Sequence, residues 1–148
     1  MTLKEKLMED LKSAMRNKEK RRKDTITMLR AAVKQREVDE RIELADEDIL
    51  AIVGKQVKQK RESIKEFQKA SRIDLVEQAE EEIEILMVYL PEQLTEDEID
   101  EIVREAIVQT GAASMRDMGR IMGVVMPKVK GKADGSLISQ SAKKLLNQ

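Results

Sequence analysis

The 148-residue sequence contains no histidine and no cysteine. Without these residues the chain cannot form a Ser–His or Cys–His catalytic pair, a disulfide or a cysteine-based zinc site. We therefore expect no catalytic residues, no metal site and no cofactor, and so no enzymatic activity. The absence of cysteine also makes the cytoplasm the default compartment.

Aromatic residues, glycine and proline are scarce: one Phe, one Tyr, no Trp, six Gly and two Pro. A core must then be built from aliphatic side chains and methionine, and there is little turn punctuation for a sheet of many strands. No apolar run approaches the ~20 residues of a membrane span, and the first residues lack the apolar stretch of a signal peptide. The charged fraction of 39% beside a hydrophobic fraction of 41% is typical of amphipathic helices with charged outer faces.

Apolar residues recur at helical spacing along the whole chain, which predicts an all-α fold. The capping box of Thr2 and Glu5 opens the first helix, and that of Thr95 and Glu98 opens the first helix after Pro91. We expect a helical hairpin or bundle in an N-terminal domain of residues 1–91 and a small three-helix C-terminal domain of residues 92–148. Four helices are expected before Pro91: from Thr2 to a break near Asn17, from that break to about residue 40, from an N-cap at Asp46 to about residue 70, and from an N-cap at Asp74 to residue 90. Three are expected after it: from Thr95 to Gly111, from Ser114 through a methionine-rich stretch, and over about 136–146.

Charge is segregated along the chain. Residues 73–110 carry thirteen acidic groups and one basic group, whereas residues 111–148 carry seven basic and two acidic groups. The acidic region 73–110 could dock a basic protein partner. Its residues Glu77, Glu80, Glu81 and Glu84 share a helix face, which we interpret as a solvated surface rather than a divalent-cation site. The basic run of residues 16–23 fits either a phosphate contact or a solvated helix corner.

The C-terminal segment "MGRIMGVVMPKVKGKADGSLISQSAKKLL" is the most specific feature. Met115, Met118, Met122 and Met126 recur at helical spacing, which indicates a flexible core stripe. Gly119 and Gly123 each cost a helix up to ~1 kcal/mol. Close approach of another helix, or of a nucleic-acid backbone, would offset that cost.

The turn "PKVKGKADGS" follows this methionine-rich stretch. Pro127 marks a kink or the helix end, and Gly131 and Gly135 permit a positive φ. The first N–H groups of the last helix, with lysines nearby, could bind an anion, although Asp134 competes for the same donors. Phosphate recognition and a plain turn both remain open on these residues alone.

This tail, together with "YLPEQLTEDEI" and "LKEKLMEDLKSAMRNKEK", resembles the GatB/YqeY family, most closely its stand-alone YqeY members. The resemblance covers essentially the whole chain. It implies an all-helical fold whose C-terminal part is similar to the tail of the tRNA-dependent amidotransferase B subunit, a tail that contacts the tRNA body while the chemistry lies in other domains. Those domains have no room in this chain, so a carbon–nitrogen ligase activity with glutamine as amido donor is the least favoured alternative.

We therefore predict a non-catalytic RNA-binding accessory protein that contacts tRNA or another structured RNA by shape and backbone, because base-stacking aromatics are missing. The alternative is a helical protein-interaction adaptor that uses its acidic region, and that region would weaken RNA affinity if it lay beside the basic one. The predicted nucleic-acid-binding residues are Lys128, Lys130, Gly131, Lys132, Gly135, Arg120, Lys143 and Lys144.

Overall fold

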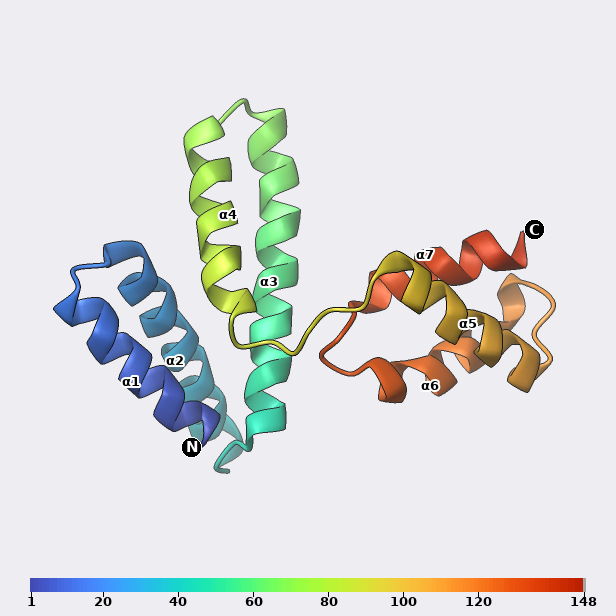
Figure 1. The fold of residues 1–148 in the computed structure, drawn as a ribbon, viewed down its shortest axis with the longest axis horizontal. Helices are drawn as coiled ribbons and strands as arrows, with labels where there is room; N and C mark the ends of the chain where they lie inside the picture. Colours follow the sequence, from blue (N-terminus) through green and yellow to red (C-terminus); the bar gives the residue numbers. More distant parts are fainter. Residues whose placement is uncertain (148) are drawn as a thin grey trace. The chain divides into compact units, whose positions relative to one another are not determined.

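The computed structural model describes residues 1–147. Helices joined by turns and loops make up this part of the chain, and it contains no strand. The all-α prediction is confirmed. The chain divides into two compact units, Met1–Leu90 (unit 1) and Pro91–Gln148 (unit 2). The helices, coloured by position in Figure 1, are α1 (Leu3–Arg16), α2 (Lys20–Glu40), α3 (Asp46–Lys69), α4 (Ile73–Met87), α5 (Glu96–Thr110), the short 3₁₀ helix η1 (Met115–Asp117), α6 (Met118–Val129) and α7 (Gly135–Leu146).

Unit 1 consists of two helical hairpins, α1 with α2 and α3 with α4, and α2 also packs against α4 (Figure 1). Its core is aliphatic except for one tyrosine, as the scarcity of aromatic residues requires. The buried residues are Leu7, Ile26, Leu29, Val33, Leu44, Ile49, Val53, Val57, Leu86 and Tyr89.

The capping boxes form as the sequence predicts. The Thr2 hydroxyl accepts the Glu5 N–H at 3.2 Å, and the Thr95 hydroxyl accepts the Glu98 N–H at 3.2 Å. The predicted break near Asn17 is also confirmed, because Asn17 is the C-cap of α1 and Lys18 has a positive φ of 56°.

Two predicted N-caps are wrong. Asp46 is the first residue of α3, and its carboxylate accepts the N–H of Leu3 at 3.0 Å instead of capping its own helix. Asp74 lies inside the first turn of α4, where it pairs with Arg72 at 3.0 Å. In both cases another group of unit 1 takes the carboxylate that the local pattern assigned to the cap.

Unit 2 is a three-helix module with its own core. The buried residues are Ile99, Val103, Ala106, Ile121, Val125, Val129, Ile138 and Ala142. Met118, Met122 and Met126 pack against this core, so the interpretation of the methionines as a core stripe is confirmed for these three, while Met115 is 42% exposed. Within residues 1–147, no helix of either unit is long and apolar enough to cross a membrane.

The start of unit 2 is tied to the loop between α6 and α7. The Leu94 N–H donates to the Lys132 carbonyl at 2.9 Å. The Gln93 side-chain amide donates to the carbonyls of Pro91 and Gly131, both at 2.8 Å. These bonds fix the backbone of the loop that carries Lys130 and Lys132 and follows directly on Lys128 at the end of α6.

Candidate nucleic-acid interface

The loop after α6 presents a fixed backbone with lysines pointing to solvent. Lys128, Lys130 and Lys132 are all exposed, at the last turn of α6 and in the loop that follows it. Gly131 has a φ of 77°, which lies in the left-handed region that disfavours residues with a Cβ. The turn therefore requires a glycine at this position. The structure therefore places three of the predicted lysines and Gly131 in one short segment.

The start of α7 is already capped from within. Asp134 accepts the Ser136 N–H at 3.3 Å and the Ser136 hydroxyl at 2.8 Å. The Leu137 N–H donates to the backbone carbonyl of Asp134 at 3.0 Å. Because these donors have protein acceptors, the lysines of the loop, rather than the helix start, are the groups that can attract a phosphate.

Gly135 has a different role from Gly131. It is the first residue of α7, and its φ is not positive. A Cβ at this position would lie 3.7 Å from the Met126 methyl carbon and 3.8 Å from that of Met122. Gly135 therefore does not use the positive φ that glycine permits, and a Cβ there would make ordinary packing contacts with the methionines of α6.

The outer face of α6 is a line of exposed small residues. Gly119, Gly123 and Pro127 follow one another at intervals of four, so they lie nearly in line along the helix. A Cβ built on Gly119 or Gly123 would meet nothing within 4 Å, so no other described part of the protein makes the close approach that these glycines permit. Pro127 also has no N–H to donate to the carbonyl of Gly123. The face therefore presents exposed backbone and the proline ring rather than long side chains.

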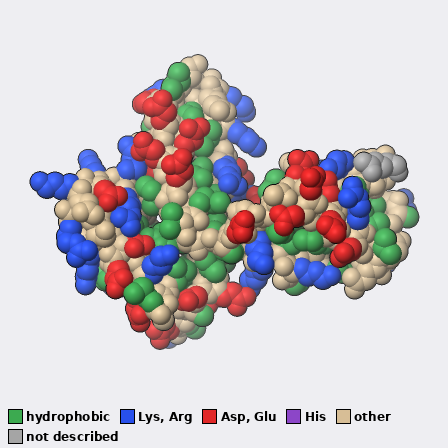
Figure 2. Space-filling model, in the orientation of Figure 1, with side chains coloured by type: hydrophobic (Ala, Val, Ile, Leu, Met, Phe, Trp, Pro, Cys, Tyr) green, Lys and Arg blue, Asp and Glu red, His purple; other side chains and the backbone are tan. Residues whose placement is uncertain are grey.

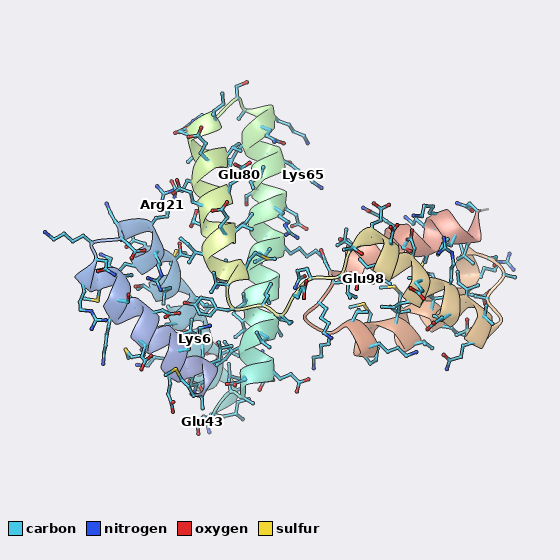
Figure 3. All side chains as sticks on the ribbon, viewed as in Figure 1. Lys6, Arg21, Glu43, Lys65, Glu80 and Glu98 are labelled. Atoms are coloured by element: carbon cyan, nitrogen blue, oxygen red, sulfur yellow. The ribbon has the colours of Figure 1, made fainter. Side chains whose placement is uncertain are left out.

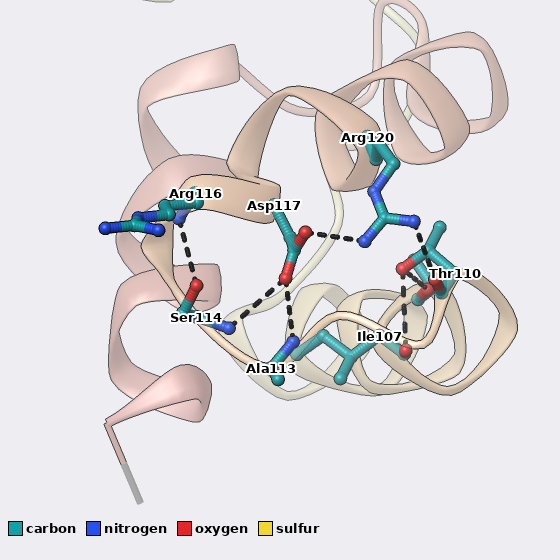
Figure 4. Close-up of polar contacts among 8 residues, drawn as sticks. Ile107, Thr110, Ala113, Ser114, Arg116, Asp117 and Arg120 are labelled. Carbon is teal, nitrogen blue, oxygen red and sulfur yellow. Dashed lines mark hydrogen bonds and ion pairs between the residues drawn. The ribbon is translucent and has the colours of Figure 1, made fainter.

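Arginines flank this face at the N-terminal end of α6 (Figure 4). The Arg120 guanidinium donates to the Thr110 carbonyl at 3.1 Å and to Asp117 at 2.5 Å, and its side chain remains 59% exposed. The Ala113 N–H, more than Arg120, holds the pKa of the Asp117 carboxyl below its ordinary value. Arg116 is exposed one turn earlier and directs its side chain away from this network. Sequence reasoning missed Arg116, although its spacing of four from Arg120 places both on one side of the helix.

The two lysines of α7 differ in their surroundings. Lys144 Nζ lies 2.5 Å from Asp100 and 3.5 Å from Glu96, both on α5. The hydrogen bond to Asp100 raises the pKa of Lys144. Lys143 is exposed and has no ion pair within residues 1–147. It lies eight residues beyond Gly135, or about 12 Å along the axis of α7 from the loop.

Asp100 and Lys144 lie beside a cavity of about 460 Å³ between α5 and α7. Asp100 is 6% exposed and accepts the Ser141 hydroxyl at 2.6 Å. The hydrogen bond from Lys144 is the main reason that the pKa of Asp100 is lowered. A serine nucleophile needs a base ready to accept its proton, and here the amine is held protonated and the carboxylate is a weakened base. The contacts of Ser141 and Lys144 with Asp100 tie α7 to α5.

The acidic region 73–110 belongs to both units, as α4 in unit 1 and α5 in unit 2. Several of its carboxylates are paired internally: Arg21 with Glu81 at 2.9 Å and Lys60 with Glu82 at 3.0 Å. Others, including Glu80, project from α4 into solvent (Figure 3). Within residues 1–147, no three acidic side chains are grouped so as to hold a metal ion.

Together these features define a class: a small all-α protein of two helical units, the second of which carries a cationic, glycine-lined helix face. The chain belongs to the YqeY-like family, because the family model described as Yqey-like protein matches residues 4–146.

Named relatives agree with this assignment. The chain is 33% identical over 144 residues to "Altered inheritance of mitochondria protein 41, mitochondrial" of Pyrenophora tritici-repentis, over 95% of this chain and 79% of that protein. It is 44% identical to the protein of the same name from Lachancea thermotolerans, over 57% of this chain and 46% of the relative. A shorter match, 40% identical over 62 residues, is to a glutamyl-tRNA(Gln) amidotransferase component of Thermococcus sibiricus, over 42% of this chain and 10% of that protein.

Proposed function

We propose that this protein is a non-catalytic RNA-binding accessory protein, with structured tRNA as the favoured ligand. The contact surface is the α6 face, defined as Gly119, Gly123, Pro127, Arg116, Arg120 and the loop lysines Lys128, Lys130 and Lys132. The observation that carries the proposal is the exposed line of small residues in a helix without any acidic residue, with basic side chains at both ends. Lys143 is a supporting contact. Lys144 contributes charge only in part, because Asp100 and Glu96 share it.

The chemistry of this face suits RNA. Helical RNA has a wide, shallow minor groove that displays 2′-hydroxyl groups and base edges, with the phosphates of the backbone on either side. A helix face without side chains can lie close to such a surface, while arginines and lysines reach phosphates on either side. Unit 2 contains no aromatic residue, so recognition is by shape and backbone rather than by base stacking.

The comparisons support tRNA as the ligand class. The amidotransferase component that shares 62 aligned residues with this chain is named for glutamyl-tRNA(Gln). The absence of histidine and cysteine supports an accessory role rather than an amidotransferase activity. We propose a cytoplasmic location from the lack of cysteine, whereas the names of the fungal relatives place those proteins in mitochondria.

A gel-shift titration of the full chain with bulk tRNA at several salt concentrations tests this function. Each phosphate contact that is removed is expected to reduce the slope of log affinity against log salt by roughly 0.7 to 0.9. The double variant Arg116→Gln, Lys128→Gln should lose about two such increments. The matched control Lys55→Gln, Lys65→Gln removes two exposed lysines of α3 and should leave the slope unchanged. Absence of tRNA binding by the wild-type chain at low salt would overturn the proposal.

A protein-interaction role is the second candidate, and one feature of α4 favours it. Its outer face has Ile73 at one end and Val88 just beyond the other, 69% and 65% exposed, with Glu77, Glu80 and Glu84 between them. A basic amphipathic partner would match this pattern. Replacing Glu77, Glu80 and Glu84 by Lys should abolish a nuclease-resistant interaction with a purified protein partner, and survival of that interaction would exclude this face.

A further inference from the structure

The α1–α2 hairpin of unit 1 is hollowed at two places where its two helices meet. Both hollows lie on the seam between these helices. One of about 590 Å³ is lined by residues that include Met8, Thr27, Arg30 and Lys34, and one of about 310 Å³ by residues that include Met15 and Lys20. Because α1 and α2 are antiparallel, the two hollows follow one another along the same pair of helices. We call them together the α1–α2 groove.

The floor of this groove is apolar and adaptable. Met8 and Met15 lie seven residues apart, which places them on one side of α1 two turns from each other. They are 37% and 59% exposed. The α2 side contributes the small side chains of Thr27 and Ala31. Exposed methionines over small residues form a surface that adjusts to an apolar partner.

The rim of the groove is cationic. Arg30, Lys34, Lys18 and Lys20 line it, and none of the four has an ion pair among the described residues. Figure 2 shows lysine and arginine side chains gathered at the left edge of unit 1, over the corner between α1 and α2. The three acids that line the two hollows are already engaged: Glu37 by Lys4, Glu19 by Arg22, and Glu5 by the Thr2 N–H in the capping box.

Four of the six basic residues in the run 16–23 fall into two sets; of the other two, Lys23 lines the second hollow and pairs with Asp24 at 3.6 Å. Arg21 turns toward α4 and pairs with Glu81, and Arg22 pairs with Asp10 at 3.6 Å. Lys18 and Lys20 remain at the groove. The first set holds unit 1 together, while the second leaves an uncompensated positive charge beside exposed methionines.

We propose that the α1–α2 groove binds an acidic amphipathic helix of a partner protein. Such a helix would place apolar side chains two turns apart on Met8 and Met15 and carboxylates against Arg30, Lys34 and the lysines of the corner. The seam from Lys4 to Met15 is about 16 Å long, which accommodates three helical turns. A nucleic-acid backbone would pair with the basic side chains of the rim but would bury no apolar surface on Met8 and Met15. A protein helix can do both and is therefore the better match. This inference concerns unit 1 and is independent of the proposed RNA function.

The probe is a labelled synthetic peptide of about four turns, with leucines spaced as one apolar stripe and glutamates on both flanks of it. Binding to the full chain is measured by fluorescence anisotropy, and the contact is located by NMR of the methionine methyl groups. Met8→Leu and Met15→Leu variants identify the two relevant signals. The expected result is a saturable shift of the Met8 and Met15 signals, while the signals of Met122 and Met126 do not move.

Charge variants test the rim. Arg30→Glu with Lys34→Glu should weaken peptide binding by about tenfold or more, because each reversal replaces an attraction by a repulsion. The control Lys55→Glu with Lys65→Glu changes the net charge equally on α3 and should leave affinity within about twofold. A scrambled peptide of the same composition should bind at least about tenfold more weakly than the patterned one.

Three results would overturn the proposal. One is equal binding of the patterned and scrambled peptides, and another is an equal loss of affinity in the rim and control variants. The third is a shift of the Met8 and Met15 signals by tRNA, with displacement of the peptide, which would make the groove a nucleic-acid surface instead. Loss of tRNA binding in the α6-face variants, with peptide binding intact, would leave this proposal standing and shows that the two surfaces are tested separately.

Discussion

The ammonium group of Lys144 lies 2.5 Å from the buried carboxylate of Asp100, on a neighbouring helix of unit 2. Ser141 donates to the other oxygen of the same carboxylate at 2.6 Å. A buried carboxylate requires such partners, because desolvation without them is costly. Lys144 therefore belongs first to the packing of α7 on α5, whereas its neighbour Lys143 faces solvent.

Replacing Lys144 by Gln should destabilise the protein. The substitution leaves Asp100 without its cation, so we expect a Tm several degrees lower than that of the wild type. Lys143→Gln is the matched control and should leave Tm unchanged, because Lys143 has no ion pair among the described residues. Circular dichroism melting curves measure both. Equal melting temperatures for the two variants would contradict a structural role for the Lys144–Asp100 pair.

The same pair predicts a pH dependence. The pKa of Asp100 is lowered in the folded protein, chiefly by the hydrogen bond from Lys144. Its contribution to stability is therefore present above the ordinary aspartate pKa of about 3.9 and is lost as the pH falls through the lowered value. The difference in Tm between wild type and Lys144→Gln should shrink below about pH 4. A difference that stays constant from neutral to acidic pH would exclude this linkage.

Gly123→Ala should raise stability and lower RNA affinity. A Cβ at Gly123 meets nothing within 4 Å, and the residue lies within α6, so alanine should stabilise the folded protein by about 0.5–1 kcal/mol. The added methyl group would hold an RNA backbone away from the α6 face. Gly54→Ala in α3 is the control, since a Cβ there also meets nothing within 4 Å. Both variants should unfold at higher denaturant concentration, but only Gly123→Ala should weaken tRNA binding. A Gly123→Ala variant with unchanged tRNA affinity would remove the glycine line from the proposed interface.

Local signals account for most of the fold that could be predicted. Thr2 and Thr95 cap their helices through residues three positions away, so the sequence contains all the information that the caps require. Asp46 and Asp74 have the same chemistry, yet their carboxylates are used elsewhere. The partner of Asp46 lies 43 residues away, and no local pattern contains it.

The candidate site divides in the same way. The lysines around Gly131 could be found from their spacing, and so could Arg116. The pairing of Lys144 with Asp100 spans 44 residues and depends on how α5 and α7 pack. Gly131 and Gly135 look alike in the sequence, but Gly131 has a positive φ, whereas Gly135 begins α7 beside the methionines of α6 without one. The role of each glycine is a property of the packed unit.

Gly131→Ala and Gly135→Ala should separate these two roles. At Gly131 alanine must adopt a φ of 77°, which costs about 1–2 kcal/mol, and its Cβ would lie 3.6 Å from the Pro91 ring. At Gly135 the φ is not positive and the new contacts, at 3.7–3.8 Å, are ordinary packing distances. We expect Gly131→Ala to lower the free energy of unfolding by about 1–2 kcal/mol and Gly135→Ala to leave it unchanged or slightly higher. Denaturant titration measures both, and a Gly135→Ala variant as unstable as Gly131→Ala would contradict this assignment.

Tyr89 offers a spectroscopic test of unit 1, because it is the chain's single tyrosine and no tryptophan is present. Its hydroxyl donates to Asp10 at 2.6 Å, and its side chain is buried. Burial, followed by the hydrogen bond to Asp10, raises the pKa of Tyr89 above its ordinary value of about 10. Since the folded pKa is the higher one, this stabilisation is complete below about pH 10 and is lost as the pH rises toward the folded value. Phenolate absorbance in the native protein should therefore appear above the pH at which it appears in denaturant.

In Tyr89→Phe the hydrogen bond to Asp10 is lost, and the free energy of unfolding at neutral pH should fall by about 1 kcal/mol. Coincident titration curves for the native and denatured chains would show that the hydroxyl is not held in this bond.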